Sequence, residues 1–123
     1  MNSFYIAILV FLGGGLGSLS RFGIGKLISN FHTSKFPAGT FTANILATLL
    51  LGLTIFFLKD KIDSNNFIKY FLIIGFCGGF STFSTFSLET ITLFKDGLFY
   101  FGLMNILMSL FVAFIIIWVL VKY

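Results

Sequence analysis

Residues that could stabilise a dehydrated anion lie close together in positions 75–87, which read GFCGGFSTFSTFS. Phe83 and Phe86 are three residues apart, a spacing that puts them on one face of a helix. The edge of a phenyl ring carries partial positive charge, so two ring edges turned toward an ion's path would attract an anion. The intervening Ser84 and Thr85 add hydroxyl donors. This pattern indicates anion binding rather than covalent chemistry.

Two further stripes of neutral polar side chains repeat every four residues. Thr40, Asn44 and Thr48 form the first stripe, and Asn105 and Ser109 form the second. An amide buried in hydrocarbon without a partner costs on the order of a few kcal/mol, so each stripe needs a ligand or a neighbouring helix. Hydroxyls and amides without carboxylates suit an anion better than a cation. The alternative that Asn44 simply joins two helices stays open.

The elements that position these residues are predicted to be membrane-spanning helices. Of the 123 residues, 58% are hydrophobic and only 10% are charged, a composition typical of an integral membrane protein. Each uncharged run is near the roughly 20 residues that a helix needs to cross about 30 Å of hydrocarbon. These runs cover residues 1–20, 36–58, 70–88 and 97–121. We therefore predict an all-α protein with one domain, residues 1–123, and four transmembrane helices at about 3–30, 38–58, 67–94 and 97–121.

The third uncharged run is predicted to contain a break. Gly78 and Gly79 stand at its middle, and each glycine costs about 1 kcal/mol relative to alanine inside a helix. We therefore expect this helix to be broken near 78–82, close to the bilayer midplane. Carbonyls freed by the break need partners where no water is present, and neighbouring hydroxyls or a cation could supply them.

The basic residues are divided evenly between the two sides of the predicted helices. One side carries Lys59, Lys61, Lys69 and Lys122, and the other carries Arg21, Lys26, Lys35 and Lys95. The positive-inside bias that normally orients a membrane protein is therefore absent, which predicts insertion in both orientations. An alternative is that Arg21 and Lys26, next to the first span, place the N-terminus outside. The scattered charges favour contact with membrane lipid headgroups and not with nucleic acid.

Small residues in the first run predict close helix packing. Gly13, Gly17 and Arg21 recur every four residues, and small residues at this spacing let helix backbones approach closely in lipid. The packing partner is either another helix of the same chain or a second copy. Arg21 itself has two interpretations, because a guanidinium at the end of a span can pair with a structural neighbour or attract anions to a vestibule.

Together, these stretches resemble the Fluc/CrcB family of fluoride channels over the whole chain. Residues 13–21 are similar to the family pattern G-G-x-x-G-A-x-x-R, with Ser18 in place of alanine. Residues 37–44 match P-x-G-T-x-x-x-N. Residues 75–86 are close to G-F-x-G-G-x-T-T-F-S-T-F, with Ser81 in place of the first threonine. This last motif is highly specific.

The resemblance implies an antiparallel dual-topology homodimer with two fluoride pores, each built from both subunits. It implies that Asn44 and the two phenylalanines line the pore, with neighbouring hydroxyls in the same segment. A polar track in the fourth helix is also usual in the family, and Phe101 stands where a tyrosine is expected. The pore residues that we expect are therefore Asn44, Phe83, Phe86, Ser84, Thr85, Thr40, Asn105 and Ser109.

The same resemblance implies a structural sodium ion at the dimer centre, held by the backbone carbonyls of Gly78 and Ser81. It also implies passive fluoride export across a bacterial cytoplasmic (inner) membrane. Fluoride enters a cell in acidified surroundings as neutral HF and is trapped inside as the anion. A passive exit path would therefore relieve fluoride toxicity.

Other classes of membrane protein fit these residues less well. A small dual-topology multidrug exporter depends on a membrane-embedded glutamate in its first helix, and this chain has no acid before Asp60. Glu89 lies just past an uncharged run, where a capping role and a role at the pore mouth both stay open. A selective cation filter needs successive carbonyl rings, and one break offers too few. A purely structural membrane subunit would leave the polar stripes unexplained.

The single histidine argues against an enzyme, and the single cysteine argues against a disulfide or a metal site. His32 has no neighbouring carboxylate in the sequence that would orient it as a catalytic base, so we expect a solvated loop histidine. Cys77 is the single cysteine, which excludes an intrachain disulfide and leaves it without partners for a metal site.

Overall fold

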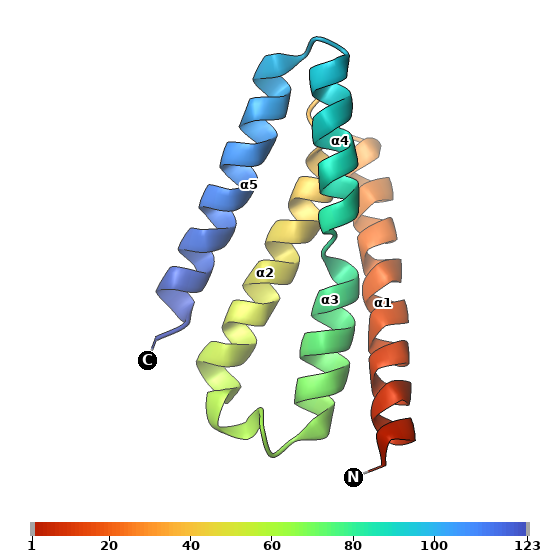
Figure 1. Ribbon diagram of the computed structural model, residues 1–123, viewed down its shortest axis with the longest axis vertical. Helices are drawn as coiled ribbons and strands as arrows, with labels where there is room; N and C mark the ends of the chain where they lie inside the picture. Colours follow the sequence, from red (N-terminus) through yellow and green to blue (C-terminus); the bar gives the residue numbers. More distant parts are fainter. Residues whose placement is uncertain (1, 123) are drawn as a thin grey trace.

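The computed structural model of the chain describes residues 2–122, and all of its regular elements within these residues are helices (Figure 1). The first helix, α1, runs over Ser3–Ser29, and the Asn2 side chain caps it by accepting a hydrogen bond of 2.9 Å from the Phe4 amide. Helix α2 covers Ala38–Leu58 and continues into a short 3-10 turn, η1, at Lys59–Lys61. The third span has three parts, the π-helical η2 at Phe67–Cys77, α3 at Gly78–Phe80 and α4 at Phe83–Lys95. Helix α5 covers Phe99–Leu120.

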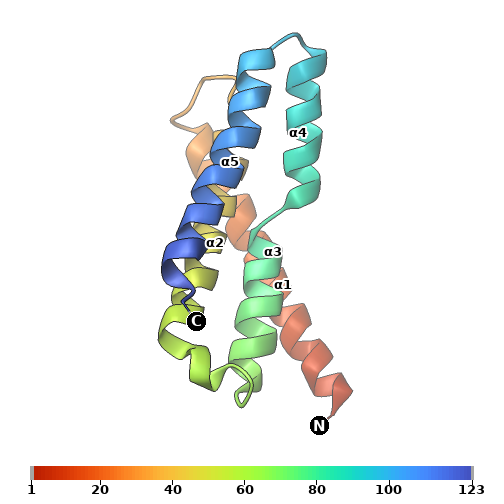
Figure 2. The same ribbon diagram turned by 60° about the vertical axis from the view of Figure 1, so that its left-hand side comes forward.

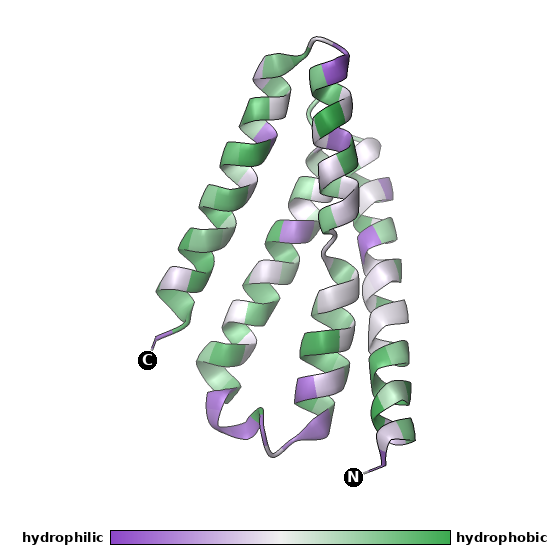
Figure 3. Cartoon of the chain, in the orientation of Figure 1, coloured by the Kyte–Doolittle hydropathy of each residue, from purple (hydrophilic) through white to green (hydrophobic). Residues whose placement is uncertain are grey.

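Four stretches are long and apolar enough to cross a membrane, which confirms the prediction of an all-α protein with four potential spans. They are Ser3–Ser29, Ala38–Lys61, Phe67–Lys95 and Phe99–Leu120. Hydrophobic residues dominate their length, and hydrophilic residues gather in the connection between α2 and η2 (Figure 3). The beginning of α1 and the end of α5 lie toward the same end of the bundle as this connection (Figure 1).

Glycines hold α1 against η2 and α3. Gly13 and Gly17 are buried, and a Cβ atom on Gly13 would lie 3.1 Å from Gly75 Cα. A Cβ on Gly17 would lie 2.8 Å from the Phe80 nitrogen. Such backbone neighbours cannot move aside as a flexible side chain would, so only glycine permits this helix spacing. Of the two partners that the sequence left open, this glycine face therefore packs against a helix of the same chain.

The third span is interrupted between α3 and α4. Ser81 has φ −86° and ψ 160°, and Thr82 has φ −150° and ψ 121°, so both have extended backbone. Figure 2 shows α4 displaced sideways from α3 and joined to it by this short extended segment. The Thr82 hydroxyl caps the start of α4 by accepting a hydrogen bond of 3.1 Å from the Thr85 amide. The interruption therefore places the beginning of α4 partway along the bundle rather than at one of its ends (Figure 2).

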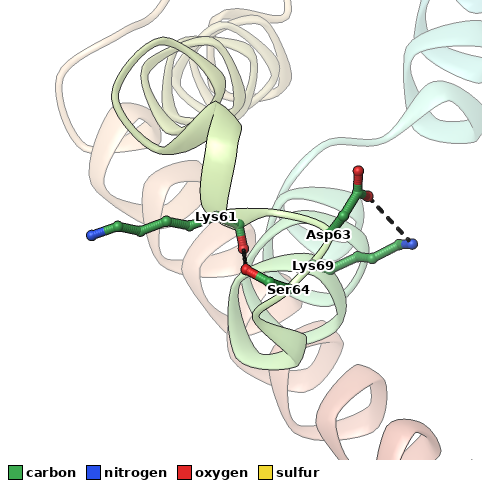
Figure 4. A network of polar contacts seen from close by, with 4 residues as sticks. All are labelled: Lys61, Asp63, Ser64 and Lys69. Atoms are coloured by element: carbon green, nitrogen blue, oxygen red, sulfur yellow. Dashed lines mark hydrogen bonds and ion pairs between the residues drawn. The ribbon is translucent and has the colours of Figure 1, made fainter.

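The connection between η1 and η2 is polar and exposed (Figure 4). The Lys69 ammonium lies 3.9 Å from the Asp63 carboxylate, and the Ser64 hydroxyl donates to the Lys61 carbonyl at 3.3 Å. Exposed ion pairs of this kind contribute at most about 1 kcal/mol. The position of this connection therefore depends mainly on the helices that it joins.

Candidate anion-binding site

Asn44 on α2 binds the extended backbone of Thr82 with both ends of its side-chain amide. Its oxygen accepts a hydrogen bond of 2.7 Å from the Thr82 amide, and its nitrogen donates one of 3.2 Å to the Thr82 carbonyl. An interruption in a helix leaves backbone groups without their usual partners, and α2 supplies those partners here. A side-chain amide nitrogen has two hydrogens, so one donor of Asn44 remains for a ligand.

A groove of about 210 Å³ lies beside this contact and brings together residues from three spans. None of its lining residues is charged. They are Asn44, Thr48, Ser81, Thr82, Phe83, Phe86, Ser109, Leu110 and Ala113. The structure thus gathers four of the predicted pore residues, namely Asn44, both phenylalanines and Ser109, around one cavity.

The two phenylalanines of the groove come from the first turn of α4. Their ring centroids are 6.0 Å apart with the ring planes inclined at 40°, and residue Phe83 is 79% exposed in the single chain. The helix begins at this point, so the partial positive charge of its N-terminus lies at the groove. A spare amide donor and a helix N-terminus favour a negatively charged ligand over a cation, and a phenyl ring does the same where its edge faces the ligand.

A second cavity, of about 280 Å³, adjoins the groove and carries positive charge. Its lining includes Arg21, Lys26, Thr40 and Thr85, and Thr82 belongs to both cavities. We call this cavity the vestibule. Two predicted site residues, Thr40 and Thr85, therefore lie in the vestibule and not in the groove.

Arg21 in the vestibule is tied to the interrupted helix. Its Nε atom donates a hydrogen bond of 3.1 Å to the Gly79 carbonyl on α3. Gly79 itself packs on Gly14 of α1 so closely that a Cβ there would clash with the Gly14 backbone. The contact supports the interpretation in which Arg21 pairs with a structural neighbour, and its position in the vestibule leaves the attraction of anions open as well.

The fourth-span stripe is divided between two environments. Asn105 is only 1% exposed, donates to the Thr90 hydroxyl at 2.9 Å and accepts from the Ser109 hydroxyl at 3.3 Å. Thr90 in turn donates to the Phe86 carbonyl at 2.7 Å. Ser109 borders the groove, whereas Asn105 does not line it and instead joins α5 to α4. This chain of hydrogen bonds reaches the backbone of a groove residue.

One predicted residue of α4 lies at its surface, and one residue of α2 contacts α4. Ser84 is exposed, and its hydroxyl lies 3.4 Å from that of Thr82. On α2, Thr40 forms a hydrogen bond with the Glu89 side chain of α4. Neither Ser84 nor Thr40 lines the groove.

The carbonyls of Gly78 and Ser81 fit the requirements of a cation. In an uninterrupted helix they would accept hydrogen bonds from the amides of Thr82 and Thr85. The Thr82 amide donates to Asn44 instead, and the Thr85 amide donates to the Thr82 hydroxyl. Gly78 and Ser81 line a cavity of about 180 Å³ together with Thr48 and Cys77. Carbonyl oxygens without amide donors are suitable ligands for a hard cation.

Sequence reasoning did not single out Thr82, the partner of Asn44. The sequence does contain a signal for the capping role of Thr82, because threonine immediately before a helical segment is a preferred capping residue. The pairing of Thr82 with an amide on another helix has no such local signal, since the two residues are far apart in the sequence.

A four-span helical chain with a basic vestibule and an uncharged groove at an interrupted helix defines a membrane protein with a candidate anion path. Residues 8–121 match the family model described as CrcB-like protein, Camphor Resistance (CrcB), and the chain belongs to this family, as its motifs predicted.

Curated relatives cover most of the chain. A protein of Ruminiclostridium cellulolyticum is 41% identical over 110 residues, which are 89% of this chain and 85% of the relative. One from Phocaeicola vulgatus is 48% identical over 92 residues, 75% of each chain. One from Pyrococcus horikoshii is 41% identical over 113 residues, 92% of this chain and 89% of the relative. Each of the three is named fluoride-specific ion channel FluC.

Proposed function

We propose that this protein is a fluoride-selective ion channel. The observation that carries the proposal is the uncharged groove at the interruption of the third span, where Asn44, Phe83 and Phe86 meet. Fluoride is small and strongly hydrated, so a path for it must replace lost water with donors and positive ring edges. The relatives named as fluoride-specific channels support the choice of this anion.

Conduction through this groove is passive and carries fluoride out of the cytoplasm. No acidic side chain lines the groove or the vestibule, so neither offers the embedded carboxylate that proton coupling needs. Fluoride that enters as HF and ionises in the neutral cytoplasm then leaves down its own gradient, which relieves its toxicity. The setting that we propose is a bacterial cytoplasmic membrane, which the four potential spans would cross.

The working unit that we propose is an antiparallel dual-topology homodimer. A single chain leaves the 79% exposed Phe83 uncovered on one side of the groove, and a second copy would complete that wall. The even division of basic residues supports insertion in both orientations. In this arrangement the interruption at Ser81 and Thr82 lies near the bilayer midplane, where two copies meet on the twofold axis.

A structural sodium ion at the centre of this dimer would be held by the Gly78 and Ser81 carbonyls of each copy. The diversion of their amide donors to Asn44 and Thr82 supports the proposal. The ion would be a positively charged partner for these carbonyls in place of the amide donors. Crystals grown with a heavier monovalent cation in place of sodium should show anomalous density on the twofold axis, and a water-filled centre would refute this assignment.

Ion selectivity tests the proposed function directly. Liposomes containing the purified protein are loaded with fluoride or chloride, and an ion-selective electrode follows the release of each. We expect release of fluoride and retention of chloride, with protein-free liposomes as the control. Equal release of both ions, or of neither, would overturn the proposal. Fluoride movement that depends on an imposed pH gradient would contradict passive conduction.

A further inference from the structure

A separate cavity of about 290 Å³ lies where the connection after α1 meets the start of α2 and the side of α4. It shares Gly25, Gly39 and Thr40 with the vestibule but none of the residues of the groove. Its lining residues are Gly25, Ile28, Ser29, His32, Ser34, Phe36, Pro37, Ala38, Gly39, Thr40 and Glu89. Ser29 and Ser34 are exposed, so the cavity has a route to solvent.

Two polar atoms of this cavity are buried without a hydrogen-bond partner, Nε2 of His32 and Oε1 of Glu89. A buried polar group that loses water and gains no partner costs about 1–3 kcal/mol. The two residues come from distant parts of the sequence, and the fold brings both to one cavity. A ligand that binds both atoms would therefore remove two penalties at once.

The other polar side chains of the cavity already have partners. The Ser29 hydroxyl donates to the Lys26 carbonyl at 2.8 Å, and the Ser34 hydroxyl accepts from the Phe36 amide at 3.2 Å. Thr40 is bonded to the Glu89 side chain. An imidazole nitrogen and a carboxylate oxygen thus remain, and this pair is typical of the ligands of Zn²⁺ and similar transition metals.

We propose that His32 and Glu89 form a binding site for a divalent transition-metal cation of the Zn²⁺ class. Zinc lies about 2.0–2.2 Å from such nitrogen and oxygen ligands, so the two side chains converge to within about 4 Å of each other on binding. Among residues 2–122, no group of three His, Cys, Asp or Glu side chains is placed to hold a metal. Water therefore completes the coordination, and the metal exchanges with solvent.

Nearby charges restrict which cation binds. Arg21 and Lys26 line the adjoining vestibule, and their positive charge repels cations held by charge alone. A transition metal gains a bond to the imidazole nitrogen that sodium, magnesium and calcium do not favour. The site is therefore expected to prefer Zn²⁺ over Mg²⁺ and Ca²⁺, and it is distinct from the proposed sodium position at Gly78 and Ser81.

Calorimetric titration of ZnCl₂ into the purified protein, with any affinity tag removed, tests this site without measuring ion flux. We expect saturable binding that weakens at least tenfold in His32→Ala and in Glu89→Gln. Ser29→Ala is the matched control, because it changes the same cavity and leaves both ligands in place. His32→Cys should retain binding, because a thiolate is also a zinc ligand.

The outcomes separate a metal site from a cavity filled only by water. Absence of zinc binding to the parent protein would overturn the proposal, and so would parent-like affinity in His32→Ala or equal affinity for Mg²⁺. Each variant is first shown to elute from a sizing column as the parent does, and His32→Asn replaces His32→Ala if the latter fails this check. Because the titration contains no fluoride, its result is independent of the proposed channel activity.

Discussion

The Asn44 side chain and the Thr82 backbone form a paired contact, with hydrogen bonds of 2.7 Å and 3.2 Å in opposite directions. Through this contact α2 fixes the extended segment from which α4 starts. Asn44 also lines the groove, so the residue that orders the interruption faces the proposed ion path. One amide therefore combines support of the interruption with a position on the proposed ion path.

Replacement of Asn44 separates these two roles. Asn44→Asp removes the donor to the Thr82 carbonyl and adds a negative charge beside the path, whereas Asn44→Ser keeps a small neutral donor. We expect Asn44→Asp to lower fluoride flux in liposomes by at least tenfold relative to Asn44→Ser, because like charge repels the anion. Comparable flux in the two variants would show that no anion passes close to this amide.

Replacement of Phe83 and Phe86 by isoleucine distinguishes a packing role of the rings from contact with the ion. Isoleucine keeps an apolar side chain, so a role in packing alone should tolerate the change. It lacks the positive ring edge, so a dehydrated anion would lose that partner. We expect Phe83→Ile and Phe86→Ile to elute as dimers from a sizing column and to release fluoride at least tenfold more slowly. Flux equal to that of the parent in both variants would assign the rings to packing alone.

The glycines of α1 give a matched pair for stability. In Gly17→Ala the new methyl group meets the Phe76 carbonyl and the Phe80 amide, whereas Gly15→Ala meets nothing within 4 Å. We expect Gly17→Ala to be destabilised by roughly 1–3 kcal/mol, as overpacked cores are. Gly15→Ala should be neutral or stabilised by up to about 1 kcal/mol through helix propensity. Thermal unfolding in detergent measures the difference, and equal stability of the two variants would contradict this packing.

The substitution Arg21→Lys tests whether Arg21 acts through its charge or through its hydrogen bond to Gly79. Lysine keeps the charge in the vestibule but lacks the planar guanidinium whose Nε donates to the Gly79 carbonyl. We expect the lysine variant to assemble poorly on a sizing column, while Lys26→Arg, which changes the exposed basic residue of the same vestibule, behaves as the parent does. A fully dimeric and fully active Arg21→Lys protein would show that charge alone is needed.

The sequence by itself determined the class of protein and its family. Hydrocarbon requires long uncharged helices, and this requirement acts on each segment separately, so the four potential spans follow from the uncharged runs. The family motifs are also local, and residues 8–121 match the family model. The glycines of residues 13–17 are a local signal as well. They predicted close helix packing, because small side chains at this spacing favour close packing whichever helix is the partner.

Only the tertiary structure decided which polar residues meet. Asn105 and Ser109 share one helical face in the sequence, yet Asn105 is buried against Thr90 while Ser109 borders the groove. Helical periodicity assigns residues to a face but does not say which helix covers that face or where the cover ends. The sequence also did not predict that Asn44 binds Thr82, or that His32 and Glu89 share a cavity. The physical reason is the same, because contacts between helices depend on how whole faces pack and not on the residues next to them in the chain.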